Sequence, residues 1–337
     1  MSTYRDAGVD IDAANHTLDL FKESVAASQD DPRVLNDVGA FGGAFHAAAL
    51  GSDPVLVASM DGVGTKVKLA ATLERWDDIG RDLVNHSVND ILVQGAKPLF
   101  FLDYVATDVL VPETVAKVVS GMAQACRESG CVLLGGETAE MPGVYTKGSL
   151  DVAGAIVGVV ERDNLLPRPA KMVAGSVLVG LESSGPHTNG YSLIRKVVEG
   201  RDLESEMLAD GRSMAEALMA PHRSYREPVE VLQAEGIAVQ GLCHITGGGF
   251  PENLPRVLPD HLGAEVDTTS WETPELFRKL VEWGDIEADE AHRVFNMGIG
   301  LIVIVASEDG QRVVEHLGGT IIGQLNDDQA GTVSLNH

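Results

Sequence analysis

The chain has little positive charge for its size. Its 337 residues include 25 Lys and Arg against 50 Asp and Glu, which gives a formal net charge of −25. A surface this negative repels a phosphate backbone, so nucleic acid is excluded as an expected partner. An anionic substrate must instead be captured by a local positive site or a metal ion. We interpret the acidity as a feature that favours solubility.

Cysteine is scarce: the chain has only Cys126, Cys131 and Cys243. An odd and sparse set excludes a disulfide framework. Cys126 and Cys131 have the spacing C-x4-C, but no second Cys or His pair flanks them, which speaks against a zinc site. We therefore expect all three to be small buried apolar residues.

Several common signatures are missing as well. No basic-then-apolar leader begins the chain and no apolar run is long enough to span a membrane, so we expect a cytoplasmic protein with no membrane partner. The P-loop pattern G-x-x-x-x-G-K-[ST], the dinucleotide pattern G-x-G-x-x-G and the nucleophile elbow G-x-S-x-G are also absent. Any nucleotide site must be built from other residues.

Strands alternate with helices in both halves, which predicts an α/β fold in two domains. Residues 164–174, with Pro167 and Pro169 and no clear period, are the predicted link. The predicted domains are 1–168 and 169–337. In the first domain we expect helices at 12–27, 76–95 and from Pro112, and strands at 54–58, 99–106, 131–134 and 151–160. In the second we expect strands at 176–181 and 297–306, and helices at 191–199, 223–234, 274–283 and 308–317.

Three segments of the first half combine carboxylates with flexible backbone. Residues 61–66, Asp-Gly-Val-Gly-Thr-Lys, and residues 135–143 follow predicted strands, and Asp90 lies near the end of a predicted helix. Asp61 and Glu137 are thus expected beyond the carboxyl ends of strands, where open α/β sheets hold ligands. If Asp90 joins them, the three carboxylates need a cation, and Mg²⁺ bound to a phosphate substrate suits them. Taken singly, each segment also fits a plain turn or helix cap.

The turn at residues 61–66 also carries donors for phosphate. The backbone at Gly62 and Gly64 can approach phosphate oxygens closely, and Thr65 and Lys66 add a hydroxyl and an ammonium group.

The second half has two histidine turns. His187 lies in residues 184–190, Ser-Gly-Pro-His-Thr-Asn-Gly, and His244 is followed by Ile-Thr-Gly-Gly-Gly-Phe. Imidazoles can transfer protons near neutral pH, and the glycines at 247–249 have the composition of an anion-binding nest before a helix. The other histidines are interpreted as surface or packed residues: His16, His46, His86, His222, His261, His292, His316 and His337.

Nearly the whole chain resembles the aminoimidazole ribonucleotide synthetase family, also called phosphoribosylformylglycinamidine cyclo-ligase. The resemblance rests on the order and spacing of many segments: 4–12, 61–66, 88–90, 93–96, 100–104, 135–143, 183–192, 244–250 and 295–298. The string Glu-Thr-Ala-Glu-Met-Pro-Gly at 137–143 separates this family from its relatives.

The resemblance implies an N-terminal ATP-binding domain whose sheet forms a barrel across a homodimer interface, and a C-terminal α/β substrate domain. It implies that ATP phosphorylates the formyl oxygen of formylglycinamidine ribonucleotide, so that the amidine nitrogen can close the imidazole ring with release of ADP and phosphate. It also suggests that Lys22 and Lys66 meet ATP phosphates, that Asp61, Asp90 and Glu137 hold Mg²⁺, and that His187 and His244 handle protons or charge. Gly247, Gly248 and Gly249 are expected at the ribose phosphate of the substrate.

Two alternatives remain open. One is another ATP-dependent member of the same superfamily, similar to formylglycinamidine ribonucleotide synthetase, which would need glutamine or ammonia. The other is a catalytically silent ATP-binding dimer.

Overall fold

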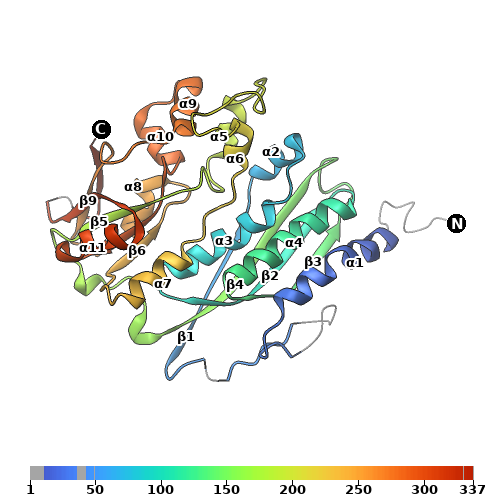
Figure 1. Ribbon diagram of the computed structural model, residues 1–337, viewed down its shortest axis with the longest axis horizontal. Helices are drawn as coiled ribbons and strands as arrows, with labels where there is room; N and C mark the ends of the chain where they lie inside the picture. Colours follow the sequence, from blue (N-terminus) through green and yellow to red (C-terminus); the bar gives the residue numbers. More distant parts are fainter. Residues whose placement is uncertain (1–10, 36–42, 49, 329, 337) are drawn as a thin grey trace. The chain divides into compact units, whose positions relative to one another are not determined.

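The computed structural model describes residues 11–35, 43–48, 50–328 and 330–336 (Figure 1). Most of the segment 4–12, on which part of the resemblance rests, lies outside the described residues. The chain divides into two compact units. The first takes in the residues up to Ile91 and Ala96–Arg162, and the second Leu92–Gly95 and the residues from Asp163 onward.

The first unit is built around one mixed sheet. Its helices are α1 (Ile11–Ser28), α2 (Lys66–Leu73), α3 (Ile79–Leu92) and α4 (Pro112–Glu128), and its strands are β1 (Pro54–Gly62), β2 (Lys97–Thr107), β3 (Val132–Glu140) and β4 (Leu150–Glu161). The four strands are ordered β1-β4-β2-β3. Because β4 is antiparallel to both β1 and β2, and β2 is parallel to β3, the strands β1, β2 and β3 all point the same way.

Helices α3 and α4 pack on one face of this sheet, and glycines permit the close approach. A Cβ at Gly80 of α3 would lie 1.9 Å from the carbonyl oxygen of Val118 in α4, and a Cβ at Gly158 of β4 would lie 2.5 Å from Ile91 of α3. On the opposite face, large apolar side chains are exposed to solvent, with Met60 of β1 at 71%. Among the residues that the structure describes, helices cover one face of the sheet, and the other, which we call the bare face, exposes large apolar side chains such as Met60.

Strands β1 and β3 are longer than the sequence predicted. We expected β3 to end at Leu134, but it continues to Glu140, so Glu137 lies inside an edge strand and not in a turn beyond it. The glycines we took for a turn serve a close contact, because a Cβ at Gly136 would lie 2.1 Å from Oδ1 of Asp103 on β2. Asp61 is likewise the penultimate residue of β1.

The second unit has a six-stranded sheet ordered β10-β7-β9-β5-β8-β6. Its strands are β5 (Val177–Glu182), β6 (Gly241–His244), β7 (Gly263–Asp267), β8 (Ile299–Val305), β9 (Thr320–Asn326) and β10 (Val333–Asn336). Its helices are α5 (Tyr191–Val197), α6 (Met214–Met219), α7 (Arg226–Ala234), α8 (Gly249–Asn253), α9 (Glu275–Gly284), α10 (Ala288–Val294) and α11 (Ser307–Leu317). Short 3-10 turns, Arg162–Asn164 and Pro169–Lys171, occupy the region of the predicted link.

Strand β8 lies in the middle of the second core. Every residue of Ile299–Val305 is buried, and its side chains alternate between two apolar clusters. Ile302 packs in one cluster with Phe250 of α8, whereas Val303 packs in the other with Leu232 of α7. Burial on both faces explains why this strand reads as a continuous apolar run. Within the described part of the chain, no helix combines the length and hydrophobicity needed to cross a membrane.

Candidate active site

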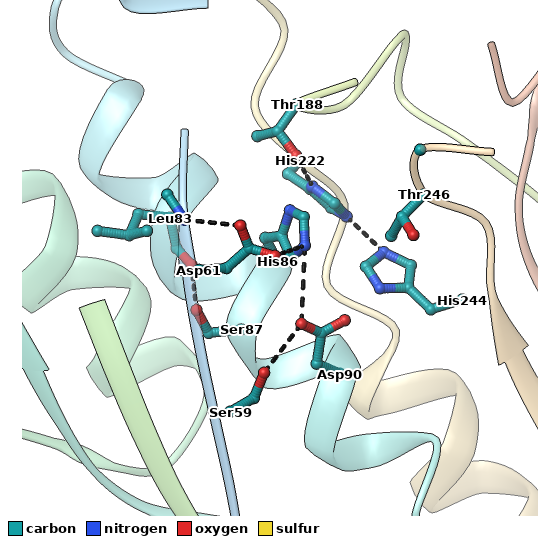
Figure 2. A network of polar contacts seen from close by, with 12 residues as sticks. Ser59, Asp61, Leu83, His86, Ser87, Asp90, Thr188, His222, His244 and Thr246 are labelled. Carbon is teal, nitrogen blue, oxygen red and sulfur yellow. Dashed lines mark hydrogen bonds and ion pairs between the residues drawn. The ribbon is translucent and has the colours of Figure 1, made fainter. Parts of the chain in front are cut away.

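In the first unit, two carboxylates converge on one histidine. Nε2 of His86 lies 2.8 Å from Oδ2 of Asp61 on β1 and 3.7 Å from Oδ2 of Asp90 on α3 (Figure 2). His86 and Asp90 are four residues apart, so they occupy one face of the helix. Oγ of Ser59, two residues before Asp61, donates a hydrogen bond of 3.2 Å to Oδ2 of Asp90. The structure thus brings together Asp61 and Asp90, two of the three carboxylates that were expected to share a cation, and adds His86.

The charge balance of this cluster favours protonation of His86. Burial is the largest influence and by itself lowers the pKa of the imidazole, but the hydrogen bond to Asp61 and the negative charges of Asp90, Asp61 and Asp82 raise it. The net effect is a pKa above the ordinary value for histidine. His86 can therefore supply positive charge between the carboxylates.

The turn after β1 leads from Asp61 into helix α2. Gly64 has φ of 64° and is exposed, which favours glycine at this position. Thr65 then precedes helix α2 as its N-cap residue. The backbone N–H of Gly62 donates to Oδ1 of Asp61 at 2.7 Å, which orients that carboxylate at the end of the strand. Backbone donors and the positive end of a helix dipole thus lie beside Asp61.

The two predicted lysines lie in very different surroundings. Lys66 is completely buried, and its ammonium group lies 2.7 Å from Oδ2 of Asp82, which is also completely buried. In this conformation a contact between Lys66 and a phosphate would require the ion pair to separate. Lys22 lies on α1 with its side chain exposed.

Glu137 does not join Asp61 within one chain. Glu137 of β3 pairs with Tyr104 of β2, Tyr104 pairs with Ala153 of β4, and Ala153 pairs with Gly62 of β1. Glu137 therefore lies in one row with Gly62, the residue after Asp61. Since successive residues of a strand point to opposite faces, Glu137 and Asp61 lie on different faces. Their strands are also three positions apart in the sheet, a separation of roughly 14 Å at the usual strand spacing.

In the second unit, the two predicted histidines meet beside β8. His187 follows β5 and His244 ends β6, and β5 and β6 flank β8 as antiparallel neighbours. Their carboxyl ends therefore lie at the same edge of the sheet. A Cβ at Gly300 of β8 would lie 2.5 Å from Cε1 of His187, so the glycine makes room for the ring. Both imidazoles are buried.

A third histidine, which sequence reasoning assigned to packing, completes this group. Nε2 of His222 lies 3.0 Å from Nε2 of His244, and its ring stacks on that of His187 with 3.9 Å between centroids (Figure 2 shows His222 with His244). His222 lies between α6 and α7, a segment with no periodic pattern. No sequence signal could have paired it with the others. For His86, by contrast, the spacing of four residues to Asp90 was a usable signal.

The glycine turn after His244 is held tightly by its own residues. Gly248 and Gly249 have φ of 92° and 59°, and the N–H of Gly249 donates to the carbonyl oxygen of Thr246 at 3.0 Å. Nδ2 of Asn253 donates to the carbonyl oxygens of Thr246, Gly247 and Gly249. The helix that follows, α8, has only 5 residues.

A separate cavity of about 440 Å³ opens in the first unit. Its lining includes Trp76, Thr107, Val111, Lys117 and Leu150. The lining contains none of the site residues predicted from the sequence.

Comparisons with known proteins match both units. The model of the AIR synthase related protein N-terminal domain matches residues 30–160, and that of the C-terminal domain matches residues 173–336. A protein of Neisseria meningitidis serogroup C named phosphoribosylformylglycinamidine cyclo-ligase is 49% identical over 318 residues, which are 94% of this chain and 91% of the relative. A protein of the same name from Paraburkholderia phymatum is 51% identical over 307 residues, 91% of this chain and 86% of the relative.

Solved structures share the fold at low sequence identity. Thiamine-monophosphate kinase from Stenotrophomonas maltophilia superposes with a TM-score of 0.70 at 17% identity, covering 94% of this chain and 96% of that one. The hydrogenase maturation protein HypE of E. coli gives 0.68 at 18%, covering 96% and 94%. A HypE solved in complex with ATP gives 0.67 at 22%, covering 96% and 91%.

Proposed function

Because this chain belongs to the AIR synthase related protein family in both of its domains, we propose that it catalyses the ATP-dependent ring closure of formylglycinamidine ribonucleotide to aminoimidazole ribonucleotide. Curated relatives about half identical over nearly the full chain carry the name of this cyclo-ligase activity. The structural observation that carries the proposal is the convergence of Asp61 and Asp90 beside the glycine turn that leads into α2.

Asp61 and Asp90 suit a magnesium ion that accompanies ATP. Both offer carboxylate oxygens, the donors that this hard cation prefers, and both approach one positively polarised group, Nε2 of His86. The ion would neutralise charge on the phosphates during transfer. We assign the contacts with the phosphate oxygens to Gly62, Gly64 and Thr65, whose backbone and hydroxyl groups lie at the start of α2. We also keep Lys22 and Lys66 as predicted phosphate contacts. For Lys66, the contact requires its ion pair with Asp82 to separate.

The chemistry follows from the weakness of a formamide oxygen as a leaving group. Transfer of the γ-phosphoryl group to the formyl oxygen makes that oxygen part of a phosphate ester. The amidine nitrogen then attacks the formyl carbon, the carbon–oxygen bond breaks and phosphate leaves. We assign proton movement in this step to His187 and His244, whose buried imidazoles meet at one edge of the second sheet. Gly247, Gly248 and Gly249 are assigned to the ribose phosphate of the substrate.

We also propose that the protein works as a homodimer. The bare face of the first sheet carries Met60 and Leu102, which pair with the same residue, Ala155, and so form one row across the strands. An exposed apolar face of this kind marks an interaction surface. Glu137 shares that face, so the partner copy is our proposed source of the third carboxylate. Pairing of edge strands β1 and β3 between copies would close the eight-stranded barrel.

A cytoplasmic location is part of the same proposal. The three cysteines are free and buried. This state suits a reducing compartment.

One assay separates the candidate functions. Purified protein is incubated with Mg²⁺, ATP and formylglycinamidine ribonucleotide without glutamine, and both ADP and the aminoimidazole product are followed. Stoichiometric formation of the two supports the cyclo-ligase. Turnover that depends on added glutamine or ammonia would indicate the synthetase-like alternative, and ATP binding without any ADP would indicate a silent dimer.

A further inference from the structure

We propose that His187, His222 and His244 form a binding site for one divalent transition-metal ion, of which Zn²⁺ is the reference case. One nitrogen from each ring lies within 4.8 Å of the corresponding nitrogens of the other two. All three side chains are buried. The set consists of imidazoles alone, whereas Asp61 and Asp90 offer carboxylate oxygens.

The three imidazoles come from separate segments that the second unit fixes in place. His187 follows β5, His222 lies between α6 and α7, and His244 is the last residue of β6. The packed domain fixes the three segments, so none of them must fold around the ion, although the ring of His187 has to reorient. Gly300 is part of this arrangement, since a Cβ there would lie 2.1 Å from Oη of Tyr225 and 2.5 Å from Cε1 of His187.

The nitrogen spacing is near that of a tetrahedral centre. Zinc–nitrogen bonds of about 2.0–2.1 Å at tetrahedral angles place two ligand nitrogens about 3.3 Å apart. Nε2 of His222 and Nε2 of His244 are 3.0 Å apart, close to this separation, and they share a hydrogen bond that an ion would replace. The ring of His187 is stacked on His222 with 20° between the planes and must turn to direct its lone pair at the same point.

One neighbouring group can set the tautomer of His222. Nδ1 of His222 lies 3.4 Å from Oγ1 of Thr188, which can accept a hydrogen bond from Nδ1–H and so leave the lone pair on Nε2. The second nitrogen of a ligand histidine commonly donates its N–H in this way. The backbone N–H of Ser184 donates to Nε2 of His187 at 3.3 Å and occupies the lone pair of that atom, so His187 must give up this hydrogen bond to present Nε2 to an ion.

The donor set decides the kind of ion. Three neutral imidazoles suit Zn²⁺, Co²⁺, Ni²⁺ or Cu²⁺, whereas Mg²⁺ prefers oxygen ligands. Three protein ligands also leave a fourth position open to water or another ligand. One consequence rests on the proposed function: a bound Zn²⁺ would occupy the imidazoles of His187 and His244 and inhibit turnover. The metal site itself does not depend on that function.

The test is a titration of the metal-free protein with Co²⁺, in the presence of excess Mg²⁺ to occupy the carboxylate site. We expect one equivalent to produce the strong visible bands of a four-coordinate Co²⁺ centre, and Zn²⁺ to displace it. In His222→Ala and in His222→Asn the affinity should fall at least tenfold, while near-ultraviolet circular dichroism verifies the fold. His316→Gln, which removes an exposed histidine that lies 3.7 Å from Glu235, is the matched control and should bind like wild type.

Weak bands typical of six-coordinate Co²⁺, or unchanged binding in both His222 variants, would overturn the proposal. The outcome is independent of the cyclo-ligase assay, because the spectrum needs neither ATP nor substrate. A protein that closes the ring but shows no four-coordinate Co²⁺ would retain the proposed function and lose the metal site. A protein that shows four-coordinate Co²⁺ but produces no aminoimidazole product would retain the metal site and lose the proposed function.

Discussion

Nε2 of His86 lies 2.8 Å from Oδ2 of Asp61, so the carboxylate of the penultimate residue of β1 is joined to helix α3 by a hydrogen bond. The contact fixes Asp61 next to Asp90 before any cation is bound. It also explains how a strongly acidic chain gathers two carboxylates at one point, because a buried imidazole with a raised pKa offsets part of their repulsion.

Replacing Asp61 by Asn should remove most of the ATP turnover. The amide keeps the shape of the side chain but loses the charge that a magnesium ion needs, and a loss of about 3 kcal/mol of transition-state stabilisation corresponds to roughly 100-fold in rate. The effect is measured as the rate of ADP formation in the presence of formylglycinamidine ribonucleotide. Asp77→Asn, at an exposed aspartate near Lys117, is the control and should keep the wild-type rate. Near-normal ADP formation by Asp61→Asn would remove this residue from the metal site.

The His86 contact should make the stability of the metal-free protein depend on pH. Since its folded pKa is raised above the ordinary value of 6.5, protonation of His86 stabilises the folded state. This stabilisation is fully present below the unfolded pKa and is lost as the pH rises through the folded pKa. His86→Gln should therefore lower the free energy of unfolding more at about pH 5.5 than at about pH 9. Urea denaturation at the two pH values measures this, and an equal loss at both would contradict it.

The buried ion pair of Lys66 and Asp82 should dominate the local stability of α2 and α3. Both side chains are fully buried, so Lys66→Met removes the cation that is paired with a buried carboxylate and should cost about 3–5 kcal/mol. The double variant Lys66→Met with Asp82→Leu removes both charges and should recover most of that loss. Urea denaturation of the single and double variants tests the coupling. Additive losses would show that the two groups do not stabilise each other.

The exposed sheet face should hold the dimer together. Met60→Asp places a charge in the row formed with Ala155 and Leu102, and burying it at an interface is costly. We expect light scattering after size-exclusion chromatography to show a dimer for wild type and a monomer for this variant. Val173→Asp, at a similarly exposed apolar residue of the second unit, should remain dimeric. A wild-type mass for Met60→Asp would argue against this face as the interface.

The sequence predicted part of the local structure and little of the long-range geometry. Strands β6, β7, β9 and β10 of the second sheet were not predicted from it. The apolar stripe predicted α3 within a few residues, whereas the predicted turn at 61–66 begins inside β1, which continues to Gly62. It did not show that β3 runs on through Gly135 and Gly136, because those glycines make room for Asp103 of a neighbouring strand. The separation of Glu137 from Asp61 depends on strand order, which no local pattern encodes. Likewise, the meeting of His222 with His244 depends on loops that converge only in the folded sheet.

The glycine turn that leads into α8 should tolerate no side chain at Gly249, the first residue of that helix. The φ of Gly249 is 59°, which disfavours other residues, and a Cβ there would lie 1.8 Å from the carbonyl oxygen of His292. Gly249→Ala must therefore displace the turn from α10, and with it the proposed contacts to the ribose phosphate. Gly211→Ala is a matched control, because its φ of 87° imposes similar strain while a Cβ would meet nothing within 4 Å. Steady-state kinetics should show a KM for formylglycinamidine ribonucleotide at least tenfold higher in Gly249→Ala than in Gly211→Ala, with a nearly unchanged KM for ATP. Equal effects on the two KM values would indicate general loosening of the protein, and the turn would then have no particular role in substrate binding.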